Sequence, residues 1–293
     1  MKNKILITPR SFEVYKGLAY PLIKEKGYEI IENTFRRTLT EDEIISLAGS
    51  NVVGIIVGID PLPARVLERC KDLRAISKYG MGLDNIDLDK AKELNIKVDR
   101  AVGTNNISVA ELAIGLRFSM ARSIPYVSTK VKEGSWDRVM GSEVFNKKLG
   151  LIGCGLIGQE VCKRALGLGM KVLVYDPYIK SDAIFNNEDV ERYYSIDELC
   201  KEADFISLHA ALTDETKGII NRHRLELMKP TAILINTSRG ELVDEDALYH
   251  ALVSQKIRGA AQDVFSTEPP EKDEKLLKLD NFILTSHIGA YTK

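Results

Sequence analysis

The chain has little cysteine and histidine, and neither is spaced like a metal-binding motif. Its 293 residues include four cysteines and four histidines, and no two cysteines form a CxxC pair. We therefore expect free thiols, a reducing cytoplasmic location and no metal site. The cysteines are Cys70, Cys154, Cys162 and Cys200.

An excess of either charge is also lacking, because 41 basic residues face 42 acidic ones and the net charge is −1. This balance argues against nucleic acid or an anionic membrane as a partner. No apolar run reaches the length needed to cross a bilayer. The start, MKNKILITPR, has neither the apolar core nor the cleavage site of a secretory signal. With 44% apolar residues and this length, we expect a globular protein of two domains.

Short β-rich runs alternate with amphipathic stretches, which is typical of parallel sheets covered by helices. The first hundred residues predict strands at 5–8, 29–31, 52–57, 73–77 and 96–98, and helices at 12–26, 41–48, 64–70 and 88–94. Pro21 should kink or split the first helix, and Thr40 with Glu43 forms a capping box.

The rest of the chain shows the same alternation around a glycine-rich unit. We expect a buried helix at 107–122, an irregular segment at 123–145, strands at 171–175, 205–208, 232–236, 257–262 and 282–285, and a helix at 244–254. The fold class is thus α/β, with two Rossmann-like, doubly wound parallel sheets that meet near residues 100–106.

The most specific motif is LGLIGCGLIGQ, where an apolar run leads through Gly153, Gly155 and Gly158 into a helical pattern. The first glycine permits a tight turn, the second lets the backbone approach a pyrophosphate, and the third lets helix pack on strand. The helix N-terminus offers N–H groups to the phosphates. Asp176 ends the next strand and can accept hydrogen bonds from both ribose hydroxyls, whereas it repels a 2′-phosphate. The motif predicts NAD as cofactor, in preference to NADP; a plain glycine-rich turn is the alternative.

Three later segments place a chemically useful side chain at a strand end, where open parallel sheets bind ligands. Arg239 follows INTS, Glu268 precedes two prolines that hold it extended, and His287 lies in SHIGA. Taken alone, Arg239 equally fits a surface salt bridge. For Glu268 taken alone, a solvated loop carboxylate is the favoured interpretation. The remaining histidines are expected to be solvated or structural: His209, His223 and His250.

Together, these three side chains fit a single catalytic mechanism. Hydride transfer to a 2-keto acid creates an alkoxide that needs a proton, which His287 can supply as imidazolium and remove in the reverse reaction. Glu268 would stabilise the imidazolium and fix the ring. Arg239 would anchor the substrate carboxylate and polarise the carbonyl.

These motifs resemble those of the D-isomer-specific 2-hydroxyacid dehydrogenases, which include phosphoglycerate dehydrogenase and hydroxypyruvate or glyoxylate reductases. The resemblance covers nearly the whole chain, since it also includes INTSRGELVDEDAL, AQDVFSTEP, SHIGA, KYGMGLDNID and NNISVAELAIGL. Several motifs in the family's order are more specific than any one of them. The resemblance implies an NAD-dependent enzyme that interconverts a small 2-keto acid and its D-2-hydroxy acid.

The resemblance also assigns roles to residues. Arg239, Glu268 and His287 fall on the family's catalytic arginine, glutamate and histidine. The implied NAD contacts, besides the motif glycines and Asp176, are Leu156, Ile157, Ala210, Thr237, Ser238, Arg239, Asp263, His287, Gly289 and Ala290. The implied substrate contacts are Arg239 and the loop formed by Lys78, Tyr79, Gly80, Met81 and Gly82. In this loop backbone N–H groups would hold the substrate carboxylate, and a plain turn is the alternative.

In domain terms, the resemblance implies a substrate-binding domain at 1–100 and an NAD-binding domain at 101–293, with a cleft between them. It also implies a homodimer formed through residues 107–145, with Trp136 and Phe145 at the interface. The family's C-terminal return helix is expected to be absent, because the sequence ends at Lys293, and Ala211 stands where the family has proline.

Among substrates, 3-phosphoglycerate and its keto acid lead, because Arg10 and Lys78 could pair with a phosphate. Each cation equally fits a solvated surface charge, so hydroxypyruvate, glyoxylate and D-lactate are alternatives. A non-enzymatic alternative is an NAD-sensing binding protein, like the corepressors built on the same fold. The neutral charge balance and the lack of tails argue against it.

Overall fold

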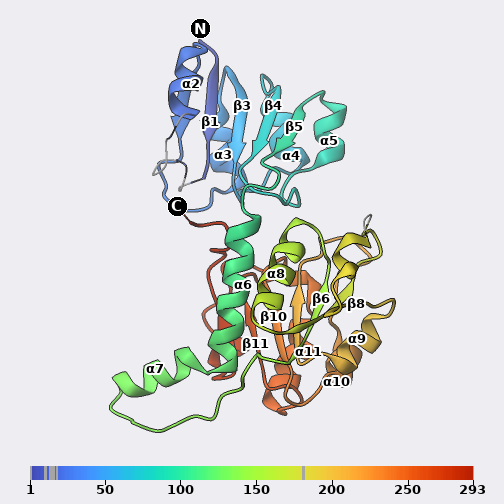
Figure 1. Ribbon diagram of the computed structural model, residues 1–293. Coiled ribbons are helices and arrows are strands. Elements are labelled where there is room, and N and C mark those ends of the chain that lie inside the picture. The colour runs from blue at the N-terminus through green and yellow to red at the C-terminus, as the bar shows by residue number, and fades with distance from the viewer. Residues whose placement is uncertain (1, 10–11, 13–16, 18, 180–181, 293) are drawn as a thin grey trace. The chain divides into compact units, whose positions relative to one another are not determined.

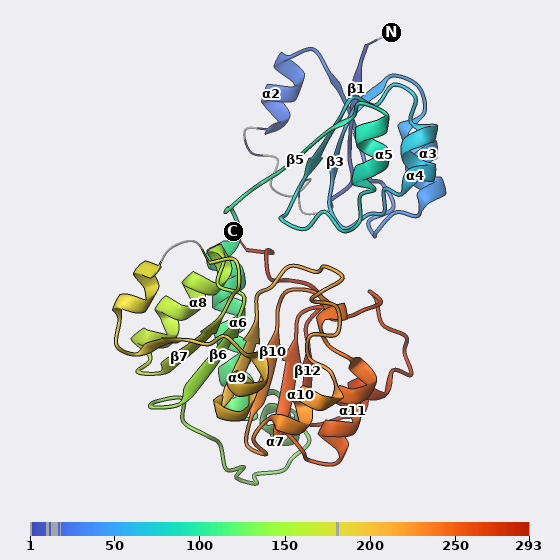
Figure 2. The ribbon, with the colours of Figure 1, turned by 90° about the vertical axis from the view of Figure 1, so that its right-hand side faces the viewer.

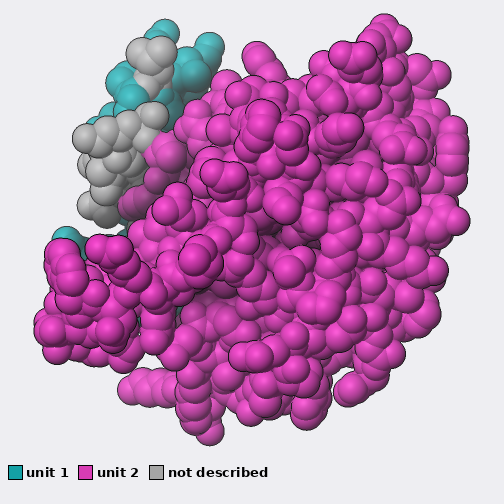
Figure 3. All heavy atoms as spheres, turned by 60° about the horizontal axis from the view of Figure 1, so that its bottom comes forward, with its two compact units in different colours: residues 1–104 teal, residues 105–293 magenta. Residues whose placement is uncertain are grey.

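A computed structural model describes residues 2–9, 12, 17, 19–179 and 182–292. The chain divides into two compact units, Met1–Thr104 and Asn105–Lys293, which Figure 3 shows in different colours. Each unit contains one sheet in which all the neighbouring strands are parallel. The predicted α/β class with two parallel sheets is therefore confirmed.

Unit 1 contains a five-stranded sheet in the order β2-β1-β3-β4-β5. Figure 2 shows α2 on one face of this sheet and α3, α4 and α5 on the other. The elements are β1 (Lys4–Ile7), α2 (Ala19–Glu25), β2 (Glu29–Glu32), α3 (Glu41–Ala48), β3 (Val52–Val57), α4 (Ala64–Arg69), β4 (Ala75–Lys78), α5 (Leu88–Glu93) and β5 (Lys97–Arg100). The strand order reverses at β1 and β3, as in one common type of doubly wound sheet.

Local sequence explains where two helices of unit 1 begin. Thr40 caps α3, and its N–H donates to Glu43 Oε2 at 2.8 Å while Glu43 N–H donates to Thr40 Oγ1 at 3.4 Å. This confirms the predicted capping box. Pro21 lies in the first turn of α2, where its missing N–H breaks no helical hydrogen bond. Residues 13–16 and 18 of the predicted helix lie outside the described residues.

Unit 2 contains a seven-stranded sheet in the order β12-β11-β10-β9-β6-β7-β8. Its helices are α6 (Asn106–Ala121), α7 (Ile124–Lys132), α8 (Leu156–Gly167), α9 (Ile196–Glu202), α10 (Arg222–Leu227), α11 (Glu245–Val253) and the 3₁₀ turns η1 (Asp182–Asn186), η2 (Gly240–Leu242) and η3 (Lys275–Lys278). Its strands are β6 (Lys148–Ile152), β7 (Lys171–Tyr175), β8 (Val190–Arg192), β9 (Phe205–Leu208), β10 (Ile233–Asn236), β11 (Gly259–Gln262) and β12 (Phe282–Leu284). The strand order reverses between β6 and β9. Doubly wound sheets bind ligands at such a switch point, outside the carboxyl ends of the strands.

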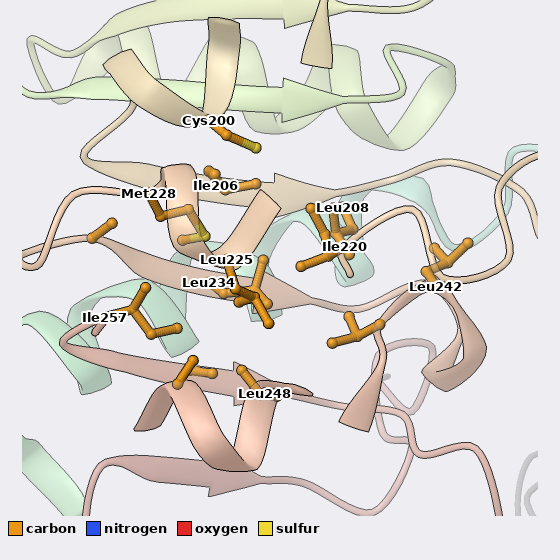
Figure 4. Packing of buried hydrophobic residues seen from close by; sticks show 14 of the residues in the cluster. Cys200, Ile206, Leu208, Ile220, Leu225, Met228, Leu234, Leu242, Leu248 and Ile257 are labelled. Carbon is orange, nitrogen blue, oxygen red and sulfur yellow. The ribbon is translucent and has the colours of Figure 1, made fainter. Parts of the chain in front are cut away.

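Both faces of the unit 2 sheet are packed, which explains why its strands read as continuous apolar runs. Leu149 and Phe205 belong to a core cluster that α6 and α8 cover. Ile206 and Leu234 belong to the opposite cluster, together with Leu248 of α11 (Figure 4). Truncating such a fully buried leucine to alanine typically costs about 2–5 kcal/mol.

The prediction of an irregular segment at 123–145 is wrong for its first part. Ile124–Lys132 form α7, which extends away from the rest of unit 2 in Figure 1 and buries none of its residues. Its apolar residues Ile124, Val127 and Val131 do recur at helical spacing, but they span only about two turns. The available signals were Pro125 in the first turn and Lys130 and Lys132 in the last.

Helix α6 lies over β10 and β11 (Figure 1). Seven of its 16 residues are buried, so it is less enclosed than the sequence predicts. The short elements β8, α9 and α10 and the three 3₁₀ turns have no predicted counterpart. Within the described residues, none of the helices combines the length and apolar character that crossing a membrane requires.

Candidate active site

Three glycines after β6 occupy three different environments. Gly153 has φ +90°, and a Cβ there would lie 2.6 Å from the Ala210 nitrogen. A Cβ on Gly158 would lie 2.4 Å from the Gly153 carbonyl oxygen, whereas one on Gly155 would meet nothing within 4 Å. The first and third positions thus allow backbones to touch, and the second faces open space. This cradle fits a pyrophosphate that approaches the backbone at Gly155.

Helix α8 begins at this cradle. Gly155 is its N-cap, no side chain caps the helix, and the Gln159 N–H donates back to the Gly155 oxygen at 3.0 Å. The N–H groups of residues 156–158 precede the first helical hydrogen bond and suit an anionic ligand. Leu156 is 48% exposed, and Ile157 packs at the edge of the core.

Asp176 fixes the glycine loop from the end of β7. Its Oδ2 accepts the Cys154 N–H at 2.7 Å, and its Oδ1 accepts the Tyr178 N–H at 2.8 Å. Each carboxylate oxygen has a second lone-pair direction, which a ribose hydroxyl can use. The Tyr178 hydroxyl donates to Glu215 at 3.1 Å, so a second carboxylate lies near this end of the site.

The ends of β9 and β10 carry two buried polar atoms that lack a hydrogen-bond partner in the described part of the chain, His209 Nδ1 and Thr237 Oγ1. Buried polar atoms are normally paired, so a bound group with polar atoms suits this edge. Burial, together with the charge of Arg117, lowers the pKa of His209 to about 3 and keeps its ring neutral. Its Nε2 lies 2.8 Å from Ser207 Oγ, as expected for a structural histidine.

Asn236, at the end of β10, organises the turn that leads to Arg239, a role that the sequence did not reveal. Its Oδ1 accepts the Ser238 N–H at 3.0 Å, and its Nδ2 donates to the Arg239 oxygen at 2.8 Å. The Ser238 hydroxyl donates to the Leu208 oxygen at 2.8 Å, which ties this turn to β9. The role of Asn236 in fixing this turn becomes visible only once the folded turn is known.

Two of the three expected catalytic side chains are in direct contact. His287 Nδ1 lies 2.7 Å from Glu268 Oε2, and Glu268 Oε1 accepts the Phe265 N–H at 3.0 Å. Burial acts to raise the pKa of Glu268. The hydrogen bond and charge of His287, the Phe265 N–H and the charge of Arg239 outweigh burial, so the pKa lies below its usual value. Glu268 is therefore an ionised partner for the imidazole.

Arg239 is close enough to Glu268 to act on its charge. It precedes η2 with extended backbone, and its Nη1 donates to the Ser238 oxygen at 2.6 Å. The structure thus brings Arg239, Glu268 and His287 together at the carboxyl ends of β10, β11 and β12. The other two histidines lie elsewhere: exposed His223 is 3.2 Å from Asp197, and His250 contacts Tyr249 in α11.

Asp263 holds the turn that carries His287. The buried carboxylate accepts the Thr285 hydroxyl at 2.5 Å and the Ile288 and Gly289 N–H groups at 2.9 and 2.7 Å. The Asp263 oxygen accepts the His287 N–H at 2.9 Å. His287 has φ +54°, a conformation that non-glycine residues rarely adopt and that surrounding structure must enforce. Asp263, which we expect to contact NAD, therefore also fixes the turn that carries His287.

Other residues of the expected cofactor site are placed as follows. The Ser108 hydroxyl donates to the Gly289 oxygen at 2.6 Å, which ties the turn to α6, and Ala290 follows on the exposed side. Ala211, in place of the family's proline, has its oxygen bonded by the Thr216 hydroxyl at 2.6 Å. That contact closes the turn without proline.

In unit 1, the loop after β4 has the backbone freedom expected of an anion-binding turn. Gly80 has φ +141°, and the Arg100 guanidinium donates to the Met81 oxygen at 2.9 Å. Lys78 is buried and its ammonium donates to Gly58 oxygen and Asn85 Oδ1, both at 2.6 Å. Lys78 therefore joins neighbouring loops. Tyr79 is 44% exposed, Gly82 ends the turn, and Arg10 lies outside the described residues.

The four cysteines are free, as predicted, and all four are buried. Burial raises the pKa of Cys154 and Cys200 to about 12, so these thiols are poor nucleophiles. Among the described residues, no three histidine, cysteine or acidic side chains are grouped to hold a metal ion.

Sequence comparison finds a matching family model and similar proteins. A family model for the D-isomer specific 2-hydroxyacid dehydrogenase, NAD binding domain, matches residues 114–289. The chain is 46% identical to a D-3-phosphoglycerate dehydrogenase of Methanocaldococcus jannaschii over 87% of its own length and 49% of the relative's. It is 45% identical to a hydroxypyruvate reductase of Thermotoga maritima over 87% of its length and 83% of the relative's. The chain thus spans about half the length of that phosphoglycerate dehydrogenase.

A solved structure of a related enzyme has the same fold. The crystal structure of D-lactate dehydrogenase from Aquifex aeolicus, complexed with NAD and lactic acid, superposes with a TM-score of 0.81 and 31% identity. The match covers 99% of this chain and 90% of that one. The chain therefore belongs to the D-isomer-specific 2-hydroxyacid dehydrogenases, a family of NAD-dependent oxidoreductases, and residues 114–289 match its NAD-binding domain.

Proposed function

We propose that this chain catalyses the reversible, NAD-linked reduction of a small 2-keto acid to its D-2-hydroxy acid. The observation that carries the proposal is the His287–Glu268 pair, 2.7 Å apart, beside Arg239 at the carboxyl edge of a Rossmann-type sheet. A general acid, the carboxylate that charges it and a carboxylate-binding cation are what this reaction needs.

The cofactor would be held by residues whose geometry fits it. Gly155 and the α8 N-terminus would take the pyrophosphate, Asp176 the adenosine ribose, and Thr237 and the turn after His287 the nicotinamide half. NAD, when bound, supplies or accepts the hydride. The negative charge of Asp176 disfavours the 2′-phosphate of NADP.

His287 moves the proton. Because Nδ1 faces Glu268, Nε2 is the atom that exchanges a proton with substrate. In reduction, Nε2 of the imidazolium protonates the former carbonyl oxygen as the C–O bond becomes single. In oxidation, neutral Nε2 takes the hydroxyl proton. The ionised Glu268 stabilises the charged ring in both directions.

Arg239 binds and orients the substrate. Its planar guanidinium can hold the carboxylate and the adjacent carbonyl oxygen, so it polarises the bond that is reduced. The backbone of the 79–82 loop would bind a substrate carboxylate, with Gly80 providing the close approach. We assign unit 1 to substrate binding and unit 2 to NAD binding on this basis.

The leading substrate pair is 3-phosphoglycerate and 3-phosphohydroxypyruvate, supported by the similarity to the dehydrogenase of M. jannaschii. Hydroxypyruvate is the second candidate, because Lys78 already donates to Gly58 and Asn85 rather than being held for a phosphate. The Thermotoga reductase, which this chain spans by 83%, supports the same candidate.

A homodimer formed through residues 107–145 is part of the proposal. In this segment Trp136 is 83% exposed, Met140 89% and Phe145 62%, although Phe145 also lies against Gly169. Large apolar side chains exposed together favour a protein interface. The four buried free thiols fit a reducing compartment, and we propose the cytoplasm.

The test is NADH and NADPH oxidation, followed side by side, with 3-phosphohydroxypyruvate, hydroxypyruvate, glyoxylate and pyruvate. We expect turnover with NADH to exceed that with NADPH. Turnover on the phosphorylated keto acid above the others supports the leading substrate, and preference for hydroxypyruvate supports the second. NADH binding without turnover on any keto acid would contradict the enzymatic proposal and favour an NAD-sensing protein.

A further inference from the structure

A carboxylate at the start of α11 accepts hydrogen bonds from the loop that carries Glu268. Glu245 is the first residue of α11, and its Oε1 accepts the Ser266 N–H at 2.8 Å. Its Oε2 accepts the Ser266 hydroxyl at 2.5 Å. Both oxygens of this side chain therefore hold one residue, two positions before Glu268.

The same loop is pressed against the turn that follows Arg239. A Cβ on Gly240 would lie 2.1 Å from the carbonyl carbon of Phe265 and 2.2 Å from the Ser266 nitrogen. The next hydrogen bond along the loop runs from the Phe265 N–H to Glu268 Oε1 at 3.0 Å. The contacts form a continuous path from Glu245 through Ser266 and Phe265 to the catalytic carboxylate.

The surroundings of Glu245 are electrostatically unfavourable for a carboxylate. It lines an open surface pocket of about 470 Å³ with Glu241, Asp244, Asp246, Glu274 and two lysines, Lys217 and Lys275. Lys275 is paired with Asp246. Burial, and then the charges of Glu274 and Glu241, raise the pKa of Glu245 above its usual value, although the two bonds to Ser266 act against this.

We infer that Glu245 is a positioning residue for the reaction: by clamping Ser266 it holds Glu268 where that carboxylate can orient His287. This inference rests on the proposed function. A positioning role explains why Glu245 bonds Ser266 with both oxygens although burial and neighbouring negative charges disfavour its ionised form. A misplacement of the catalytic groups by about 1 Å can cost a factor of about 10² in rate, so a clamp on the neighbouring backbone is significant.

The experiment is a double-mutant cycle on kcat for keto-acid reduction, with NADH affinity and thermal midpoint measured for every variant. We expect Glu245→Ala to lower kcat roughly tenfold, with NADH affinity unchanged. In a Glu268→Gln background the same change should lower kcat by less than about twofold, because a clamp that acts through Glu268 has nothing left to position. Ser266→Ala, which removes one of the two bonds, should give a smaller loss.

Asp246→Ala is the matched control. It removes an acid from the same first turn of α11, with the same effect on the helix dipole, but Asp246 pairs with Lys275 and not with Ser266. Its kcat should equal the parent's.

A parent-like kcat in both Glu245→Ala and Ser266→Ala would overturn the inference, as would an equal loss for Glu245→Ala in both backgrounds. If Glu245→Ala does not fold, Ser266→Ala in the two backgrounds decides the matter alone. A parent-like kcat in Glu268→Gln itself contradicts the proposed function instead, so the two failures are distinguishable.

Discussion

Nδ1 of His287 lies 2.7 Å from Oε2 of Glu268, and the other oxygen of that carboxylate is fixed by a backbone N–H at 3.0 Å. The imidazole is thus oriented by a carboxylate that is itself oriented by the main chain. A second restraint acts on the His287 backbone through Asp263. The ring is therefore held by Glu268 and its backbone by Asp263.

Replacing His287 should abolish proton transfer with little effect on cofactor binding. We expect His287→Asn to lower kcat by roughly 10² or more, because asparagine tolerates positive φ but cannot exchange a proton. NADH affinity, measured by fluorescence titration, should stay near the parent's. His223→Asn is the control, since His223 is exposed on α10. A parent-like kcat for His287→Asn would show that another group supplies the proton.

Glu268→Gln should slow reduction and change how stability depends on pH. Glutamine lacks the negative charge that stabilises the charged imidazole ring of His287, so kcat for keto-acid reduction should fall. The pKa of Glu268 is lowered on folding, so its stabilising contribution is present above the unfolded value of about 4.3 and is lost as pH falls through the folded value. Thermal midpoints of parent and variant should therefore converge as the pH falls below the lowered pKa of Glu268. A difference in midpoint that stays the same at every pH would contradict the pairing.

Arg239 should not tolerate lysine. An ammonium cannot reproduce the bidentate fork, so we expect Arg239→Lys to lower kcat/KM for the keto acid by roughly 10²–10³. NADH affinity should change little. The comparison with Arg239→Ala separates charge from geometry: if lysine restored the parent's kcat/KM, charge alone would be enough.

Much of this site was readable from the sequence, because its chemistry follows local rules. A strand, three glycines at fixed spacing and an acid at the next strand end place Gly153 and Asp176 without any long-range information. Arg239, Glu268 and His287 were found in the same way, since each follows a strand and strand ends of a parallel sheet share one edge.

The supporting contacts could not be read in this way. Asp263, Asn236 and Glu245 act on backbone N–H groups of loops whose positions depend on how separate turns meet. Helix α7 was missed for a different reason: Ile124, Val127 and Val131 recur at helical spacing over only about two turns, and none of its residues is buried within the described chain. Sequence patterns mainly predict burial against the chain's own core, and neither these loop contacts nor α7 depend on such burial.

Asp176 should determine cofactor choice, but it also supports the glycine loop. We expect Asp176→Ala to relax discrimination against NADPH and also to weaken NADH binding, because the Cys154 N–H loses its acceptor. Asp176→Asn keeps an acceptor and removes the charge, so it should relax the discrimination with a smaller loss of NADH affinity. The measurement is the ratio of kcat/KM for NADH and NADPH. An unchanged ratio in both variants would mean that another residue distinguishes the two cofactors.

Gly240 should be the glycine at which a single methyl group does most harm to catalysis. A Cβ there would lie within 2.6 Å of three backbone atoms of Phe265 and Ser266, so the loop that carries Glu268 must shift. We expect Gly240→Ala to lower kcat roughly tenfold or more and to cost about 1–3 kcal/mol in the free energy of unfolding. Gly167→Ala is the matched control, because its Cβ would meet nothing within 4 Å at the end of α8. The control should leave kcat unchanged and stabilise the fold by about 0.5–1 kcal/mol in urea titrations. Equal kcat values in the two variants would show that the loop can move without disturbing Glu268.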